Sequence, residues 1–367
     1  MSSHGLSVII PVRGRRSQLQ RLIDSLCRAQ SRLAATRQWN SEIIVVDDTP
    51  VRMDGELIKS MCARSGVRYV RGPREVAAKR NLGAQLASYD LFVFVDSDCV
   101  ADEELLVTHA QAHLTSLARS GRPLGAVAGA IDFDDDGAAS EPPEGSDLLD
   151  APFAWPRRFV EVYWAATANF SVSREAFEMV DGFDDYPFTP VGGEDADIGM
   201  RLYDAGYAIV CEPSARVFHE AQSRQSSVHM CAKMYMYGRA CIYNNVRRPG
   251  ESKLVVNMPA VAALAGVCFA GRRRRTGLGL TTGLLAYVIA SAAKRRSHGS
   301  KATGPQYLEF FYQAGMASEA IRRKKPWLAF CMFDYGNRDR FLTRAVMSDT
   351  THAEHSCLTI RHSSVNG

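Results

Sequence analysis

The stretch that decides the fold is VFVDSDCV, residues 93–100, where an apolar run ends in Asp96 and Asp98. A short apolar run of this kind is typical of a buried strand, and we predict a strand over LFVFV, residues 91–95. Paired carboxylates at a strand end can hold Mg²⁺ or Mn²⁺, which commonly shares its coordination with substrate phosphates. Solvated turns also carry an Asp-x-Asp pair. The position directly after a strand is what favours a metal site.

The same alternation of apolar strands and helices runs through the first 131 residues. Strands are predicted over residues 7–12, 42–48, 67–70, 91–95 and 126–131. Helices are predicted from an N-cap at Ser17 to residue 33, over 56–64, and from Gly72 through Ala87. This alternation indicates an α/β fold with a doubly wound, mostly parallel sheet flanked by helices. Ligands bind such sheets at the carboxyl ends of the strands, where Asp47 and Asp48 also fall.

The composition describes a globular chain without a disulfide framework. The 367 residues are 46% hydrophobic and 23% charged with a net charge of +4, enough for two domains and unlike a disordered chain. The nine cysteines are odd in number and include no C-x-x-C pair, which argues against structural zinc and fits a reducing compartment. The first apolar run is broken by Pro11, so no signal peptide is expected. We therefore expect a cytoplasmic protein.

The C-terminal third has a different pattern, with apolar segments beside basic clusters. The apolar segments cover residues 254–270 and 276–293, each near the lower length limit of a membrane span. A spanning hairpin would place the basic clusters at 272–275 and 294–296 on opposite faces, which the positive-inside rule disfavours. We expect in-plane helices that lie peripherally on the inner face of the cell membrane. A buried helical hairpin is the alternative.

A second acidic cluster, about a hundred residues after the first, follows a glycine-rich turn. Glu194, Asp195 and Asp197 begin a predicted helix, where negative charge suits the helix dipole. Neither G-x-x-x-x-G-K-[ST] nor a G-x-G-x-x-G after the first strand is present. Bound phosphates would therefore need a metal and basic side chains, for which the candidates are Arg13, Arg74, Lys79 and Arg80.

Six segments in order carry a resemblance to a known family: SVIIPVRGR, EIIVVDDTP, REVAAKRNLGAQLA, FVDSDC, TANFSVSREAF and GGEDADIGMRL. Together they resemble bacterial-type family 2 glycosyltransferases of the GT-A fold, over residues 5–245. The resemblance implies a metal-dependent, inverting transfer of one sugar from a nucleotide-diphosphate donor, UDP being favoured, to an acceptor hydroxyl. It implies Mg²⁺ or Mn²⁺ as cofactor, and a hexosyltransferase as the type of enzyme.

The resemblance also assigns roles to residues of this chain. It implies donor binding by Pro11, Arg13, Asp47, Asp48, Arg80, Asn81 and Asp96. It implies metal binding by Asp98 together with Asp96 and His219, although His219 is also explained as a core histidine. Asn169 is a further candidate for binding a sugar hydroxyl, with a turn residue as the alternative.

The catalytic base is expected in the second acidic cluster. It must stand away from the metal, so Asp98 is excluded, and we expect Asp195 to take the acceptor proton. Glu194 is a reserve or orients the acceptor, and Asp197 is a reserve or caps the helix. Trp155, Tyr163 and Trp164 are either a sugar platform or core residues.

The expected organisation has four parts. Residues 1–120 form the nucleotide-sugar half, 121–245 the acceptor and base half, 246–345 a basic helical extension, and 346–367 a polar tail. The Q-x-x-R-W signature of processive synthases is missing, so transfer of a single sugar to a glycan, lipid-linked or small-molecule acceptor is expected, with no nucleic acid as partner. The alternatives are a sugar-nucleotide nucleotidyltransferase, against which the absent G-x-G-[ST]-R segment counts, and a catalytically inactive sugar-nucleotide-binding relative.

Overall fold

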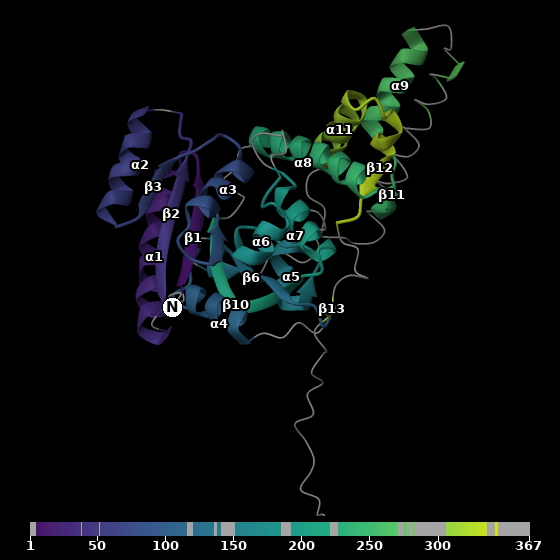
Figure 1. Ribbon diagram of the computed structural model, residues 1–367. Coiled ribbons are helices and arrows are strands. Elements are labelled where there is room, and N and C mark those ends of the chain that lie inside the picture. The colour runs from purple at the N-terminus through teal and green to yellow at the C-terminus, as the bar shows by residue number, and fades with distance from the viewer. Residues whose placement is uncertain are drawn as a thin grey trace, which may run out of the picture.

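A single mixed sheet organises the N-terminal two thirds of the chain (Figure 1). The computed structural model describes residues 5–37, 39–50, 52–115, 120–135, 138–140, 151–184, 192–220, 227–270, 306–335 and 342–343, with isolated positions between 275 and 282. In this part of the chain the strand order is β13-β8-β10-β6-β9-β4-β1-β2-β3, with β5 and β7 as short additions on β10 and β6.

The first half of the sheet is parallel, as the alternating pattern predicts. Its strands are β1 (Gly5–Val12), β2 (Asn40–Asp47), β3 (Arg68–Arg71) and β4 (Leu91–Val95), joined by helices α1 (Arg16–Arg37), α2 (Arg52–Arg64) and α3 (Val76–Leu86). β1 pairs in parallel with β2 and β4, and β2 with β3. Two helix starts differ from prediction: α1 begins at Arg16, so Ser17 lies inside its first turn, and α3 begins four residues after Gly72.

The second half adds antiparallel pairs. Its elements are β5 (Cys99–Ala101), α4 (Leu105–Thr115), β6 (Leu124–Asp135), β7 (Ala138–Ser140), α5 (Ala151–Arg158), β8 (Phe159–Val162), β9 (Asn169–Ser173), α6 (Arg174–Met179), α7 (Glu194–Asp204) and β10 (Ala208–Glu220). β9 runs antiparallel to both β4 and β6, whereas β10 is parallel to β6. The α/β, mostly parallel architecture flanked by helices is thus confirmed. At the centre of the sheet, β9 runs antiparallel to both of its neighbours.

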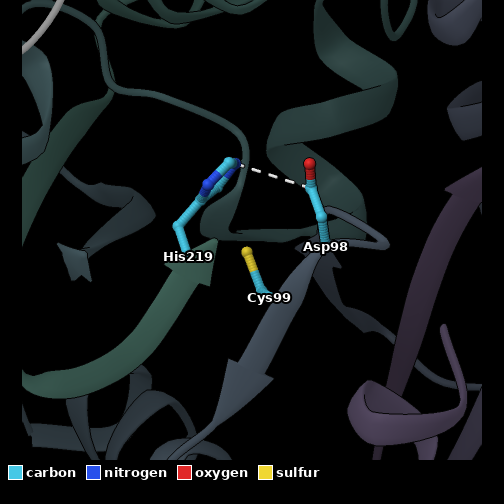
Figure 2. Close-up of side chains that lie close together, drawn as sticks. All are labelled: Asp98, Cys99 and His219. Atoms are coloured by element: carbon cyan, nitrogen blue, oxygen red, sulfur yellow. Dashed lines mark ion pairs between the residues drawn. The ribbon is translucent and has the colours of Figure 1, made fainter. Parts of the chain in front are cut away.

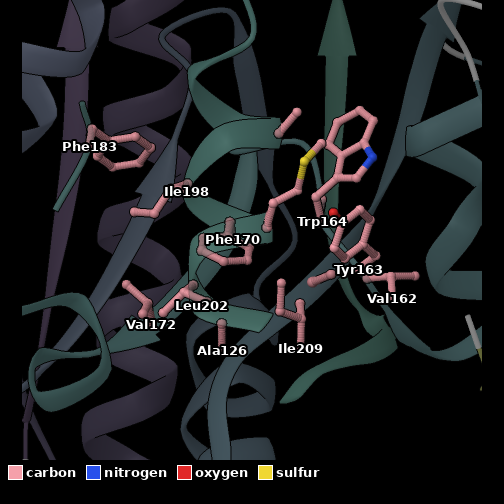
Figure 3. Close-up of a cluster of buried hydrophobic side chains, with 14 of the residues drawn as sticks. Ala126, Val162, Tyr163, Trp164, Phe170, Val172, Phe183, Ile198, Leu202 and Ile209 are labelled. Atoms are coloured by element: carbon pink, nitrogen blue, oxygen red, sulfur yellow. The ribbon is translucent and has the colours of Figure 1, made fainter. Parts of the chain in front are cut away.

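Two apolar clusters bury the two faces of the sheet. One face packs α1 and α4 through residues such as Leu22, Leu26 and Leu106. The other includes Trp155, Tyr163 and Trp164, whose side chains are 7%, 0% and 7% exposed. Figure 3 shows Tyr163 and Trp164 in this cluster together with Phe170 and Ile209. These aromatic residues are therefore core, and the alternative of an open sugar platform is wrong.

The C-terminal region is a helical extension beside the sheet, and α8 joins the two. Its elements are α8 (Ser227–Arg247), β11 (Ser252–Leu254), α9 (Met258–Ala270), α11 (Gln306–Arg322) and β12 (Cys331–Phe333), after which β13 (Leu342–Thr343) pairs with β8 of the main sheet. α11 packs along α8, and β11 pairs with β12 (Figure 1). Within the described residues no helix combines the length and apolarity needed to cross a membrane. Most of the second apolar segment, 276–293, lies outside the described residues.

Candidate active site

The end of β2 places two acids in different environments. Asp48 is almost buried and forms ion pairs with Arg13 and Lys79. Lys79, on α3, also donates a hydrogen bond of 3.1 Å to the carbonyl of Val12 at the end of β1. These contacts join the ends of two neighbouring strands to α3. They also occupy two of the four basic residues considered for phosphate binding.

Asp47 is fully buried and its carboxylate is surrounded by donors. One oxygen accepts 2.8 Å from the backbone N–H of Thr49, and the other accepts 2.9 Å from the hydroxyl of Tyr69. Arg71 adds an ion pair at 3.3 Å from the next strand. Asp47 therefore stabilises the β2 end itself, and Asp48 beside it is the more accessible acid of the pair.

Arg80 connects the first acidic cluster to the second. Its side chain is 3% exposed, and it donates 2.9 Å to Asp96 and 3.0 Å to Glu194, 114 residues later in the chain. Burial raises the pKa of Asp96, but the positive charges of Arg80 and His219 outweigh it, so its pKa lies below the ordinary value. Glu194 also accepts 3.0 Å from the N–H of Gly192. The sequence-predicted donor residues Arg80 and Asp96 thus meet in one ion-pair network.

Asp98, Cys99 and His219 bring three potential ligand atoms within 4.8 Å of one another (Figure 2). His219 Nδ1 lies 2.8 Å from the carbonyl of Glu220, which fixes the proton there and leaves Nε2 facing Asp98 at 3.5 Å. Burial and the charges of Asp98 and Asp96 raise the pKa of the Cys99 thiol well above its ordinary value, and soft sulfur ligands do not suit Mg²⁺ or Mn²⁺.

The remaining donors are one carboxylate and one imidazole. This set fits a hard divalent cation that completes its shell with water and phosphate oxygens. Asp96 lies outside the group and faces Arg80 instead. The predicted ligands Asp98 and His219 are therefore brought together by the fold, from the β4–β5 turn and the end of β10.

Asp195 is the acid whose protonation is most perturbed among these residues. It stands in the first turn of α7, which begins after Gly193 at φ +89°, a left-handed conformation that favours glycine. Burial, followed by the negative charge of Glu194, raises the pKa of Asp195 to about 7. Its neighbour Glu194 is neutralised by Arg80, whereas Asp195 makes no ion pair with another described residue. A carboxyl group with this pKa can take a proton near neutral pH.

Three other predicted residues serve the scaffold. Asp197 is 2% exposed and accepts 2.8 Å from Arg201 and 2.9 Å from Arg247, so it is an ion-pair centre. Asn81 exchanges hydrogen bonds with the backbone of Phe183 at 2.7 and 2.9 Å. Pro11 is buried inside β1.

Asn169 is a correction. It is fully buried, and its amide bonds the carbonyls of Ala130 and Ala215 and the ring of His109, at 2.8–2.9 Å. All of the amide's contacts lie within the core, so the predicted contact with a sugar hydroxyl does not fit its position.

The fold agrees with comparisons to known proteins. Residues 7–121 match the model of glycosyl transferase family 2. This N-terminal part of the chain is therefore similar to glycosyl transferase family 2. The validoxylamine A glucosyltransferase of Streptomyces hygroscopicus subsp. jinggangensis is 30% identical over 229 residues, which cover 55% of this chain and 52% of the relative. The pre-mycofactocin glycosyltransferase of Mycobacterium tuberculosis is 27% identical over 271 residues, covering 71% and 52%.

The chain spans about half the length of those curated relatives. Among solved structures, it resembles the mannosyltransferase PcManGT from Pyrobaculum calidifontis, determined in complex with GDP-Man and Mn²⁺. The TM-score is 0.52 at 17% sequence identity, and the match covers 88% of this chain and 87% of that chain. The likeness supports the GT-A-like fold over most of the chain.

Several residues near this site were missed from the sequence. Arg15 lies in the turn between β1 and α1 with a backbone φ of +58°, and its side chain forms an ion pair with Asp98. Lys233 and Tyr237 approach from α8, in a region that no motif covers. The signal for Arg15 was the run Arg13-Gly14-Arg15-Arg16 directly after a strand, of which only Arg13 was considered.

Proposed function

We propose that this protein transfers one hexose from a nucleotide-diphosphate donor to an acceptor hydroxyl by single displacement, with inversion at the anomeric carbon. The observation that carries the proposal is the pairing of two acids in opposite states. The ion pair with Arg80 lowers the pKa of Asp96, so Asp96 stays ionised. Asp195, next to the Glu194 partner of the same arginine, has a pKa of about 7. Separate acid environments within one site are how one fold assigns different roles to like groups.

Donor binding follows from the strand ends. Asp48, with Arg13 and Lys79, would receive the nucleoside at the end of β2, and Asp96 the ribose. Asp98 and His219 would hold Mg²⁺ or Mn²⁺. When bound, that cation would act as a Lewis acid on the leaving diphosphate. The mannosyltransferase determined with GDP-Man and Mn²⁺ supports this class of donor and metal. UDP, GDP and dTDP are the nucleotides to test.

Asp195 would take the proton of the acceptor hydroxyl as its oxygen bonds to the anomeric carbon and the bond to the diphosphate breaks. General-base assistance of this kind typically contributes about 10²–10⁴-fold. The ion pair with Arg80 holds the Glu194 carboxylate in place, and the negative charge of Glu194 raises the pKa of Asp195. The names of the relatives, a glucosyltransferase and a glycosyltransferase, support hexosyl transfer.

We further propose a peripheral contact with the inner face of the membrane through the C-terminal extension. Leu264 and Val267 on α9 are 49% and 71% exposed, and Trp327 is 60% exposed. The exposed cations Lys324 and Lys325 adjoin Trp327 in the chain. Apolar side chains flanked by cations suit an anionic bilayer surface. Sedimentation with phosphatidylglycerol vesicles, but not with phosphatidylcholine vesicles, is expected, and equal recovery with both would contradict the contact.

Calorimetry with UDP, GDP and dTDP, each with and without Mn²⁺, tests the proposed function on the wild type and Asp98→Ala. We expect one nucleotide to bind with metal and to lose that metal dependence in the variant. A transferase then releases the same diphosphate from its sugar donor, and Asp195→Asn should stop release while keeping binding. Binding without turnover would identify an inactive relative, and pyrophosphate release from a nucleoside triphosphate would identify a nucleotidyltransferase.

A further inference from the structure

The helix α8 brings a cation and a phenol to the acidic clusters. Lys233 Nζ lies 5.7 Å from the centre of the Tyr237 ring, one helical turn further along. The Tyr237 ring lies against Gly192, where an added Cβ would come within 2.9 Å of the ring. Gly192 immediately precedes the turn that begins α7, which carries Glu194 and Asp195. The Lys233–Tyr237 pair therefore lies next to the predicted base.

The charges of the site act on both members of this pair. Tyr237 raises the pKa of Lys233, burial opposes this, and Asp98 and Asp96 add to the rise. Lys233 is thus a stable cation that experiences the field of both strand-end acids. Burial raises the pKa of Tyr237, Lys233 opposes it, and the charges of Asp195 and Glu194 add to the rise. The phenol therefore stays neutral near the base, and Lys233 lies within electrostatic reach of the strand-end acids.

The other cations near these acids have carboxylate partners. Arg13 and Lys79 pair with Asp48, and Arg15 pairs with Asp98. Lys233 is half-buried and, among the described residues, forms no ion pair with a carboxylate within 4 Å. A leaving diphosphate carries more negative charge than one divalent cation neutralises. An ammonium group held nearby without a carboxylate partner can stabilise the negative charge that the divalent cation leaves on the diphosphate.

We propose that Lys233 binds the diphosphate of the donor from α8, and that Tyr237 is a positioning residue for its ammonium group. This inference rests on the proposed function, because it needs a diphosphate beside Asp98. As the bond to the anomeric carbon breaks, its electron pair stays on the diphosphate, and the ammonium stabilises the charge that develops there. Lys233 keeps its proton throughout.

The C-terminal extension fixes the position of this lysine. At Gly238 an added Cβ would lie 1.8 Å from the carbonyl oxygen of Tyr312 on α11. At Gly315 an added Cβ would lie 2.0 Å from the carbonyl of Tyr235. The two helices therefore cross with their backbones in contact, directly beside Tyr237. Buried Glu319 on α11 adds an ion pair of 3.2 Å with Arg239 of α8. The packing of α11 against α8 thus fixes the position of Lys233 beside the site.

The test is calorimetry on the full chain with Mn²⁺, using UDP, UMP and uridine, or the guanosine or thymidine series if the wild type prefers it. Lys233→Met keeps the length of the side chain and removes its charge. We expect its Kd for the diphosphate to rise about 10-fold or more, as for loss of a charge-assisted hydrogen bond. The Kd for the nucleoside should change less than about 2-fold, a difference too small to signal a lost contact. Lys59→Met, which removes an exposed lysine of α2, is the matched control and should bind like the wild type.

Each outcome decides the inference. Lys233→Arg should restore most of the diphosphate affinity, because it restores the cation. Tyr237→Phe should weaken diphosphate binding less than Lys233→Met does, and leave uridine binding unchanged. If Lys233→Met binds the diphosphate as tightly as the wild type, or loses nucleoside affinity by the same factor, the inference is wrong while the proposed function stands. If the wild type binds no nucleoside diphosphate with or without Mn²⁺, the proposed function itself fails.

Discussion

Replacing Asp195 by asparagine should inactivate the protein and stabilise it at the same time. Its pKa is raised from 3.8 to about 7, chiefly by burial and by Glu194. Ionising Asp195 in the folded state is therefore more costly than in the unfolded chain. Stability is lost as the pH rises from about 4 to about 7, because the folded state holds the proton over that range. At 1.36 kcal/mol per pKa unit, the cost reaches about 4 kcal/mol at pH 8 and about 1.6 kcal/mol at pH 5.

The asparagine variant removes this cost, so its gain in stability over the wild type should grow by about 2 kcal/mol between pH 5 and pH 8. Urea unfolding of both proteins at the two pH values measures the gain. Sugar transfer should fall about 10²–10⁴-fold, and in the wild type kcat should rise through pH 7 as Asp195 loses its proton. Nucleotide affinity should be unchanged.

The matched comparison is Asp197→Asn, two residues along the same helix. Asp197 is buried and paired with Arg201 and Arg247, so losing its charge breaks the Arg201 ion pair and leaves Arg247 with Asp184 alone. It should destabilise the fold by about 3–5 kcal/mol and leave the pH dependence of kcat in place. Opposite signs for the two variants support the assignment of Asp195. A destabilised Asp195→Asn variant, or a wild-type rate that is flat between pH 6 and pH 8, would refute the reasoning.

Three further substitutions probe the rest of the framework. Arg80→Met should lower the free energy of unfolding by about 3–5 kcal/mol, since it leaves Asp96 and Glu194 unpaired; urea unfolding measures it, and an unchanged midpoint would contradict the network. His219→Ala should weaken Mn²⁺ binding by about 10-fold or more, measured by calorimetry with Mn²⁺ alone, and equal affinity would remove His219 as a ligand. Gly238→Ala should destabilise by about 1–3 kcal/mol, because its Cβ would meet the backbone of α11, whereas Gly266→Ala, with open space around it, should be neutral or stabilising; thermal unfolding compares the two.

The parallel half of the fold could be predicted because its signals are local. Each strand from β1 to β4 is a short apolar run, and the helices between them repeat at helical spacing. The antiparallel strand β9 could not be derived in the same way. Its sequence, NFSVS, has no feature that specifies pairing with β4 and β6. What holds it is Asn169 and Ser171, whose bonds to two histidines of α4 depend on tertiary contacts.

The position of a site residue could be predicted where it stands at a strand end, whereas a role that depends on a tertiary partner could not. Asp98 and His219 follow from strand-end positions. Asn169 was misassigned because an amide looks the same in the sequence whether it faces a sugar or three core groups. Asp195 and Asp197 are both acids in the first turn of α7, and only the arginines that surround Asp197 separate their roles.

The ion pairs of the site also explain why a cation from α8 is needed. Arg80 is bound by Asp96 and Glu194, and both Arg13 and Lys79 are bound by Asp48. Such cations fix the acids in place, but they reach a ligand only by giving up a buried partner, and breaking a buried ion pair is costly. In the site residues from the first 220 positions, the charges of these cations and acids thus largely cancel. Charge for a departing diphosphate must come from a side chain whose partner is neutral, and a lysine beside a phenol on α8 meets that requirement.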